Sequence, residues 1–166
     1  MMQQPKKILI YGYGNPGRQD DGLGPAFAET VENWVKETGI TGIDTDSNYQ
    51  LNIEDAYTIS EYDIVIYADA SKEDIEHFMI DRVAPSDKVA FNTHSASPGF
   101  VLDLCHRLYA KDPLVILLHI KGYEFGMKET LTPEAAVNLD MAFNFIENIL
   151  LIPDKLLEYR SAIPAK

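Results

Sequence analysis

The chain has 166 residues, of which 46% are hydrophobic, and its 14 basic and 26 acidic residues give a formal net charge of −12 at pH 7. This length predicts a single domain over residues 1–166 with a sizeable core, and no apolar run approaches the roughly 18 residues that a membrane span needs. The acidic balance disfavours nucleic acid and anionic membrane surfaces as partners.

The chain begins with a predicted strand that is followed by a glycine-rich loop. The apolar run at 8–11 ends at Gly12, and a polar loop then leads to two adjacent carboxylates, Asp20 and Asp21, before a helix predicted over 24–37. Open α/β sheets place their ligands outside the carboxyl ends of their strands. We therefore expect a binding site in this loop.

The remaining chain alternates strands and helices. Strands are predicted over 40–46, 62–70, 78–83 and 114–120, and helices within 49–59 with Asn52 as N-cap, over 98–110 and over 131–150, with a short appended helix or a frayed tail at 153–166. The runs at 62–70 and 114–120 are apolar on both faces, as in a parallel sheet. This order predicts an α/β fold, a three-layer α/β/α sandwich with a mostly parallel central sheet of the phosphorylase/hydrolase-like kind.

Three polar residues lie where predicted strands end: Asp21, Asp69 and His94. The carboxyl ends of parallel strands lie along one edge of the sheet, so these side chains can converge there. Two carboxylates and an imidazole suit a divalent metal such as Ni²⁺ or Zn²⁺. Simpler interpretations stay open, because Asp21 can cap the helix, Asp69 can cap the next turn and His94 can be a surface residue.

The other histidines and the single cysteine are expected to be structural. His77 and His106 are placed on predicted helices and are expected to face solvent or to pack. His119, late in a buried strand, is expected to be a satisfied core histidine rather than a ligand. Cys105 is expected to be a buried, inert thiol. A single cysteine excludes an internal disulfide, so a cytoplasmic location is expected, and no signal peptide is predicted.

The glycine spacing also raises a nucleotide-binding alternative. The glycines at 12, 14 and 17 have the spacing of a dinucleotide fingerprint. That motif opens directly into a helix, however, whereas here two carboxylates intervene and would face the pyrophosphate. Asp20 is expected to bond loop amides or to pair with Arg18, which leaves Asp21 as the functional acid of the pair.

Four blocks of sequence, in order, resemble a known family: GYGNPGRQDDGLG at 12–24, DIVIYADA at 63–70, NTHSASPG at 92–99, and IKGYEFG followed by LTPEA within 120–135. Together they make the chain similar to the hydrogenase maturation proteases, the endopeptidases that trim the C-terminal extension of the large subunit of nickel-iron hydrogenases. The resemblance implies that the chain removes this extension from a nickel-loaded large-subunit precursor, which would be its partner, and so activates the hydrogenase.

The resemblance also implies roles for individual residues. Asp21, Asp69 and His94 would hold the nickel already inserted in the precursor, so the metal would arrive with the substrate. Contacts to the substrate chain are expected from the glycine-rich loop: Gly12, Gly14 and Asn15. Since the blocks contain no serine or cysteine nucleophile, direct attack by water is expected, with Asp21 or Asp69 as the base of an aspartic-type peptidase. Which acid is the base stays open at this point.

A second function class stays open beside the endopeptidase. A non-proteolytic, metal-recognising maturation chaperone on the same fold would bind the loaded precursor without cutting it. The complete set of two acids and a histidine argues against it. A co-encoded hydrogenase subunit with a C-terminal tail would favour the protease.

Overall fold

The computed structural model describes residues 5–88 and 96–158. Along the chain its elements are β1 (Ile8–Tyr13), the 3₁₀ segment η1 (Pro16–Gly22), α1 (Leu23–Thr38), β2 (Ile43–Asn48), α2 (Asp55–Ile59), β3 (Ile64–Ser71), β4 (Phe78–Arg82), α3 (Pro98–Tyr109), β5 (Leu114–Lys121), α4 (Pro133–Leu150) and α5 (Asp154–Leu157). The predicted strands and helices are confirmed, with small shifts in their bounds. The short appended helix is α5, and residues 159–166 lie outside the described part.

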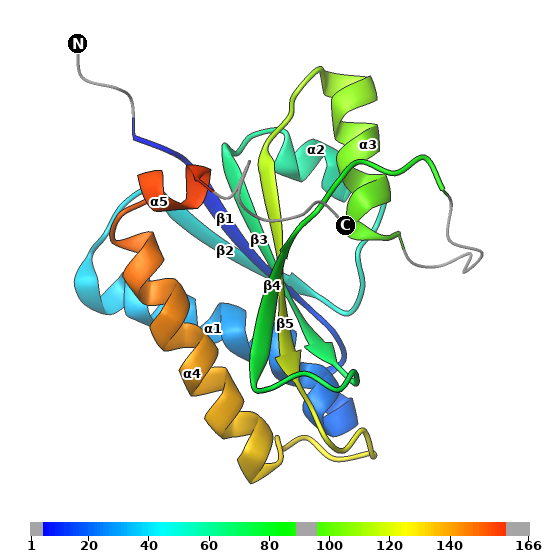
Figure 1. Cartoon of the computed structure of the whole chain (residues 1–166), viewed down its shortest axis with the longest axis vertical. Coiled ribbons are helices and arrows are strands. Elements are labelled where there is room, and N and C mark those ends of the chain that lie inside the picture. The colour runs from blue at the N-terminus through cyan, green and yellow to red at the C-terminus, as the bar shows by residue number, and fades with distance from the viewer. Residues whose placement is uncertain (1–4, 89–95, 159–166) are drawn as a thin grey trace.

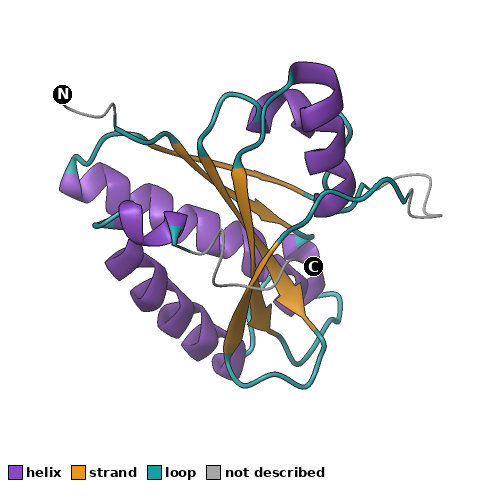
Figure 2. Ribbon diagram, turned by 45° about the horizontal axis from the view of Figure 1, so that its top comes forward, coloured by secondary structure: helices purple, strands orange, loops and turns teal. Residues whose placement is uncertain are grey.

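The five strands form one sheet in the order β2-β1-β3-β5-β4. β1 pairs in parallel with β2 and β3, β3 pairs in parallel with β5, and β4 runs antiparallel along the outer edge of β5. Helices α1 and α4 cover one face of the sheet, and α2 and α3 cover the other (Figures 1 and 2). The α/β/α sandwich with a mostly parallel sheet is therefore confirmed.

Alternation along the strands divides the core into two clusters, one on each face. Ile8, Ile10, Ile64 and Ile66 belong to the cluster under α1 and α4. The residues between them, such as Val65, pack under α2 and α3. Both faces of the central strands are thus apolar, which is why β3 and β5 are nearly continuous hydrophobic runs. None of the helices within the described ranges is long and apolar enough to cross a membrane.

Local capping explains where several helices begin or end. The side chains of Ser97 and Thr132 accept hydrogen bonds from the first turns of α3 and α4, and Gly39 ends α1 in a left-handed conformation. The expected N-cap at Asn52 is wrong. α2 begins three residues later, at Asp55, whose carboxylate accepts the backbone N–H of Asn52 at 2.8 Å and holds the preceding turn.

Candidate active site

The loop between β1 and α1 is folded tightly against its neighbours, and glycines make this possible. A Cβ atom on Gly12 would lie 2.0 Å from the carbonyl oxygen of Gly24, at the start of α1. Gly14 has φ +141°, and a Cβ there would lie 2.0 Å from the carbonyl oxygen of Asp21. Only glycine fits these positions. The described contacts of both glycines are therefore structural, and their expected contact with substrate stays a prediction.

The segment η1, which follows the glycines, was not predicted from the sequence. Asn15 caps it, because its side-chain oxygen accepts the backbone N–H of Gly17 at 2.9 Å. Inside η1, Gln19 has a positive φ of 55°, and its backbone N–H bonds the carbonyl of Lys128 at 2.8 Å. Along the chain, η1 and its two carboxylates lie between the glycines and α1, so the loop does not open directly into a helix as a dinucleotide fingerprint does. This geometry does not support nucleotide binding.

Asp20 ties η1 to the loop between β5 and α4. The fully buried carboxylate accepts hydrogen bonds of 2.8–3.1 Å from the backbone N–H groups of Tyr123, Glu124 and Thr132 and from the Thr132 hydroxyl. Burial alone would raise the pKa of Asp20, but these donors outweigh it and hold the pKa below its usual value. The expectation that Asp20 bonds loop amides is confirmed.

Asp21 has a different environment from its neighbour. It is partly exposed, and its carboxylate accepts the backbone N–H of Asn15 at 2.7 Å. This bond is local to the loop and leaves further lone pairs of the carboxylate available. Its negative charge acts on Asp69, so the two predicted acids share one electrostatic site.

Asp69 lies near the end of β3, at the carboxyl edge of the sheet. Burial raises the pKa of Asp69 to about 7, and the charge of Asp21 adds to the rise. Hydrogen bonds from the Tyr13 hydroxyl and from the backbone N–H of Ala70 oppose it. A carboxyl group that can hold or release a proton near neutral pH, beside a second carboxylate, marks a candidate functional site.

Tyr13, which lies between the two glycines at the end of β1, was not predicted as a site residue. Its hydroxyl hydrogen-bonds Asp69, and its ring packs edge to face with Tyr67 at a centroid distance of 6.0 Å. Burial, and next the charge of Asp69, raise the pKa of Tyr13 well above its usual value, so the hydroxyl stays protonated and donates. The strand register shows the relation, and the sequence alone does not: β1 pairs with β3, and Tyr13 follows Gly12, the partner of Ala68.

His94, the third predicted ligand, lies outside the described residues, so its position relative to the two acids stays a prediction. Within the described residues, no group of three His, Cys, Asp or Glu side chains is placed to hold a metal ion. The donor chemistry of Asp21 and Asp69 nevertheless suits a divalent cation, since a cation would relieve the repulsion between them. A complete metal site here requires at least one ligand from elsewhere.

The remaining histidines and Cys105 are occupied in structural contacts or lie at the surface. His119 is satisfied as expected, with Nε2 2.8 Å from Oδ2 of Asp81 on β4. His106 is exposed near the end of α3. The placement of His77 on a helix is wrong: it lies just before β4 with φ 62°, and its Nδ1 contacts Oδ1 of Asn138 at 2.9 Å. Cys105 is buried, and burial raises the pKa of its thiol, which makes it unreactive.

Known proteins share this architecture although their sequences have diverged. No protein-family model matches the chain, and no curated protein sequence matches it. Among solved structures, the NiFe hydrogenase maturation protease HycI from Thermococcus kodakarensis is 21% identical with a TM-score of 0.69, and the match covers 87% of this chain and 92% of that one. The hydrogenase maturating endopeptidase HybD from Escherichia coli is 22% identical with a TM-score of 0.64, over 84% and 89% of the two chains.

A third solved structure also matches, with lower sequence identity. The hydrogenase 2 maturation peptidase from a Thaumarchaeota archaeon is 16% identical with a TM-score of 0.61, and the match covers 87% of this chain and 98% of that one. These matches cover 89%, 92% and 98% of the other three chains, so the similarity extends over most of the fold. The chain therefore has the fold of the hydrogenase maturation proteases.

Proposed function

We propose that this protein is an endopeptidase that removes the C-terminal extension of a nickel-loaded hydrogenase large-subunit precursor. The observation that carries the proposal is the pair of acids, Asp21 and Asp69, at the carboxyl edge of a fold that is shared with hydrogenase maturation proteases. The four sequence blocks support it, because both acids lie in the blocks that resemble that family. The partner would be the precursor, and the nickel would belong to the substrate rather than to the resting enzyme.

We assign the role of general base to Asp69. With a pKa raised to about 7, its carboxylate can accept a proton from a water molecule near neutral pH. The oxygen of that water attacks the carbonyl carbon of the scissile peptide, the carbon–nitrogen bond breaks, and the proton passes to the leaving amine. Tyr13 keeps the carboxylate oriented during this exchange through its hydrogen bond. The enzyme would thus be an aspartic-type peptidase that needs no covalent intermediate.

We assign Asp21, together with His94, to the recognition of nickel in the substrate, which leaves the carboxylate of Asp69 free of the metal to act as the base. The backbone N–H of Asn15 holds one oxygen of Asp21, which leaves the other available for a ligand. When the precursor is bound, its nickel would supply positive charge near the acids and would polarise groups beside it. Gly12, Gly14 and Asn15 would line the path of the substrate chain. The cytoplasmic location inferred from the single cysteine belongs to the same proposal.

Mass spectrometry of the nickel-loaded precursor tests the proposal directly. We expect the wild-type protein to release a C-terminal peptide, and Asp69→Asn and His94→Ala variants to leave almost all of the precursor intact, with only a small residual rate. The same precursor without nickel is the matched control and should also stay intact. Binding of the precursor without cleavage by the wild type would contradict the peptidase and favour the chaperone alternative.

A further inference from the structure

A row of polar side chains crosses the sheet on the face that α2 and α3 cover. Asp69 on β3 and His119 on β5 are direct partners in the parallel register. Tyr13 follows Gly12, which is the partner of Ala68, so Tyr13 lies beside Asp69 on the other side. Paired residues of neighbouring parallel strands project from the same face, with strands about 4.8 Å apart. Asp69 is therefore flanked by Tyr13 on one strand and by His119 on the next.

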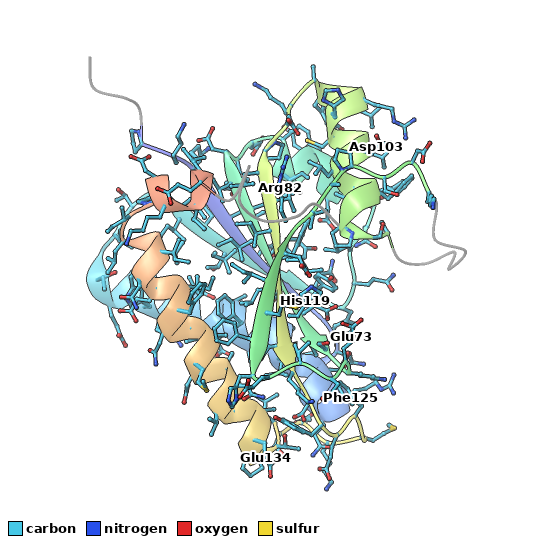
Figure 3. All side chains as sticks on the ribbon, in the orientation of Figure 1. Glu73, Arg82, Asp103, His119, Phe125 and Glu134 are labelled. Carbon is cyan, nitrogen blue, oxygen red and sulfur yellow. The ribbon has the colours of Figure 1, made fainter. Side chains whose placement is uncertain are left out.

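Asp81 contacts His119 from β4, the strand that lies on the other side of β5 from β3. The antiparallel register places Met79 opposite His119, and Asp81 follows two residues later on the same face of β4. The side chains of His119 and Asp81 are only 17% and 13% exposed, and the distance from Nε2 to Oδ2 is 2.8 Å. A carboxylate has no proton to donate, so Nε2 carries the proton and the ring is held in one orientation. Figure 3 labels His119 on β5, next to the antiparallel β4.

This pair is an unusual choice for a core position. On the same face of β5, the preceding positions are apolar, at Val115 and Leu117. A buried ionisable pair seldom stabilises a fold more than apolar side chains of the same volume. A fold that needed only packing at this point would be served by another aliphatic residue. The position of the pair directly beside Asp69 suggests what it is used for.

We propose that His119, oriented by Asp81, is a positioning residue for Asp69; the inference rests on the proposed peptidase function, in which Asp69 is the base. The Tyr13 hydroxyl, at the end of β1, hydrogen-bonds the carboxyl group of Asp69, and the register places His119 next to Asp69 on β5. We expect these two neighbours to confine the side chain of Asp69 to one rotamer, close enough to Asp21 for the charge of Asp21 to act on it. Such support places a reacting group before the substrate arrives.

The first test measures the rotamer of Asp69 in the free protein by nuclear magnetic resonance, from three-bond couplings to its β protons. We expect one staggered rotamer in the wild type and averaged couplings in His119→Asn. The matched control is His77→Asn, because His77 is also held by a partner side chain but lies outside the row, and asparagine tolerates its positive φ. A single Asp69 rotamer in His119→Asn would overturn the proposal, whether or not the protein is a peptidase.

The second test measures processing of the nickel-loaded precursor. His119→Asn should lower kcat about 10- to 100-fold, as is typical of residues that orient a functional group from behind, with KM changed less than about twofold. Asp81→Ala, which frees the ring, should act alike, whereas Asp81→Asn keeps an acceptor for Nε2 and should retain most of the activity. These two variants keep the test open if His119→Asn does not fold.

A double-variant comparison separates positioning from an independent role. If His119 acts through Asp69, then adding His119→Asn to Asp69→Asn should lower the residual rate no further. Independent, multiplicative losses would contradict the proposal, as would an unchanged kcat in both His119→Asn and Asp81→Ala. Absence of processing by the wild type would instead refute the proposed function, and the rotamer measurement would still decide the positioning role.

Discussion

Two adjacent acids in this protein, Asp20 and Asp21, are expected to respond in opposite ways to the same substitution. Asp20→Asn places an amide in a site built from donors. Its oxygen can replace the carboxylate oxygen that accepts three bonds, but its NH₂ group then faces the buried N–H of Thr132. Asp21→Asn keeps an oxygen for the amide of Asn15 and stays partly exposed.

The contacts give the size of the effect. Leaving the buried amide of Thr132 unpaired costs about 2 kcal/mol, and removing the charge from each of the three remaining bonds costs about 1 kcal/mol. Asp20→Asn should therefore lower the free energy of unfolding by about 5 kcal/mol, and lower Tm by about 10–20 °C for a domain of this size. For Asp21→Asn the change should be less than about 1 kcal/mol, although processing of the precursor should be lost.

Urea unfolding at pH 7, followed by the fluorescence of the single tryptophan, Trp34, measures both variants. Because the pKa of Asp20 is lowered in the folded state, its stabilisation is full above the ordinary value of 3.8 and is lost as the pH falls through the folded pKa. The difference between wild type and Asp20→Asn should thus narrow in acid. Equal losses from the two variants at pH 7, or a cost for Asp20→Asn below about 1 kcal/mol, would refute the reasoning.

Three further predictions concern the same region. Because the pKa of Asp69 is raised, the folded state binds its proton more tightly, and the metal-free wild type should lose stability as the pH rises from 3.8 to about 7. Relative to the wild type, Asp69→Asn should therefore gain stability across this window. Urea unfolding in the presence of a chelator measures the difference in the free energy of unfolding, and a difference that does not vary with pH would contradict the prediction. Tyr13→Phe removes a hydrogen bond that lowers the pKa of Asp69, so the pH midpoint of processing should move upward while Tm changes little. An unchanged midpoint would show that Tyr13 does not influence the base. Gly14→Ala should destabilise the fold by at least about 2 kcal/mol in urea unfolding, since its φ and the carbonyl of Asp21 both exclude a methyl group; Gly39→Ala, which meets no atom within 4 Å, is the control and should cost only about 1 kcal/mol.

The fold could be predicted from the sequence because its signals are local and strong. β3 and β5 are short runs of apolar residues, buried on both faces, and α3 and α4 each begin with a capping side chain followed by proline. The start of α2 was misplaced since Asn52 resembles an N-cap in sequence, whereas its backbone N–H is instead bonded by Asp55. The hydrogen bonds at the starts of α3 and α4 and the bond between Asp55 and Asn52 all join residues only a few positions apart in the sequence.

The site was predictable only in part, because its contacts span long distances along the chain. The two acids could be placed on one edge from the rule that parallel strands end together, and the charge of Asp21 does act on Asp69. The donors to Asp20 come from residues 103 to 112 positions later, in a loop whose path no local pattern predicts. The 3₁₀ segment η1, which carries both Asp20 and Asp21, depends on that same loop, since the backbone N–H of Gln19 bonds Lys128.

Strand order and register explain why Tyr13 and His119 escaped a functional assignment. In sequence, His119 is a polar residue late in an apolar run, and a satisfied core histidine is the reasonable interpretation of it. The structure confirms that it is satisfied, by Asp81, and also shows that β5 lies directly beside β3 in the sheet. Moving the pairing of β5 by one residue would turn His119 to the opposite face. The proposed relation of His119 to Asp69 is therefore a property of register, which a single sequence does not contain, and its test is the behaviour of Asp69 when that one neighbour is removed.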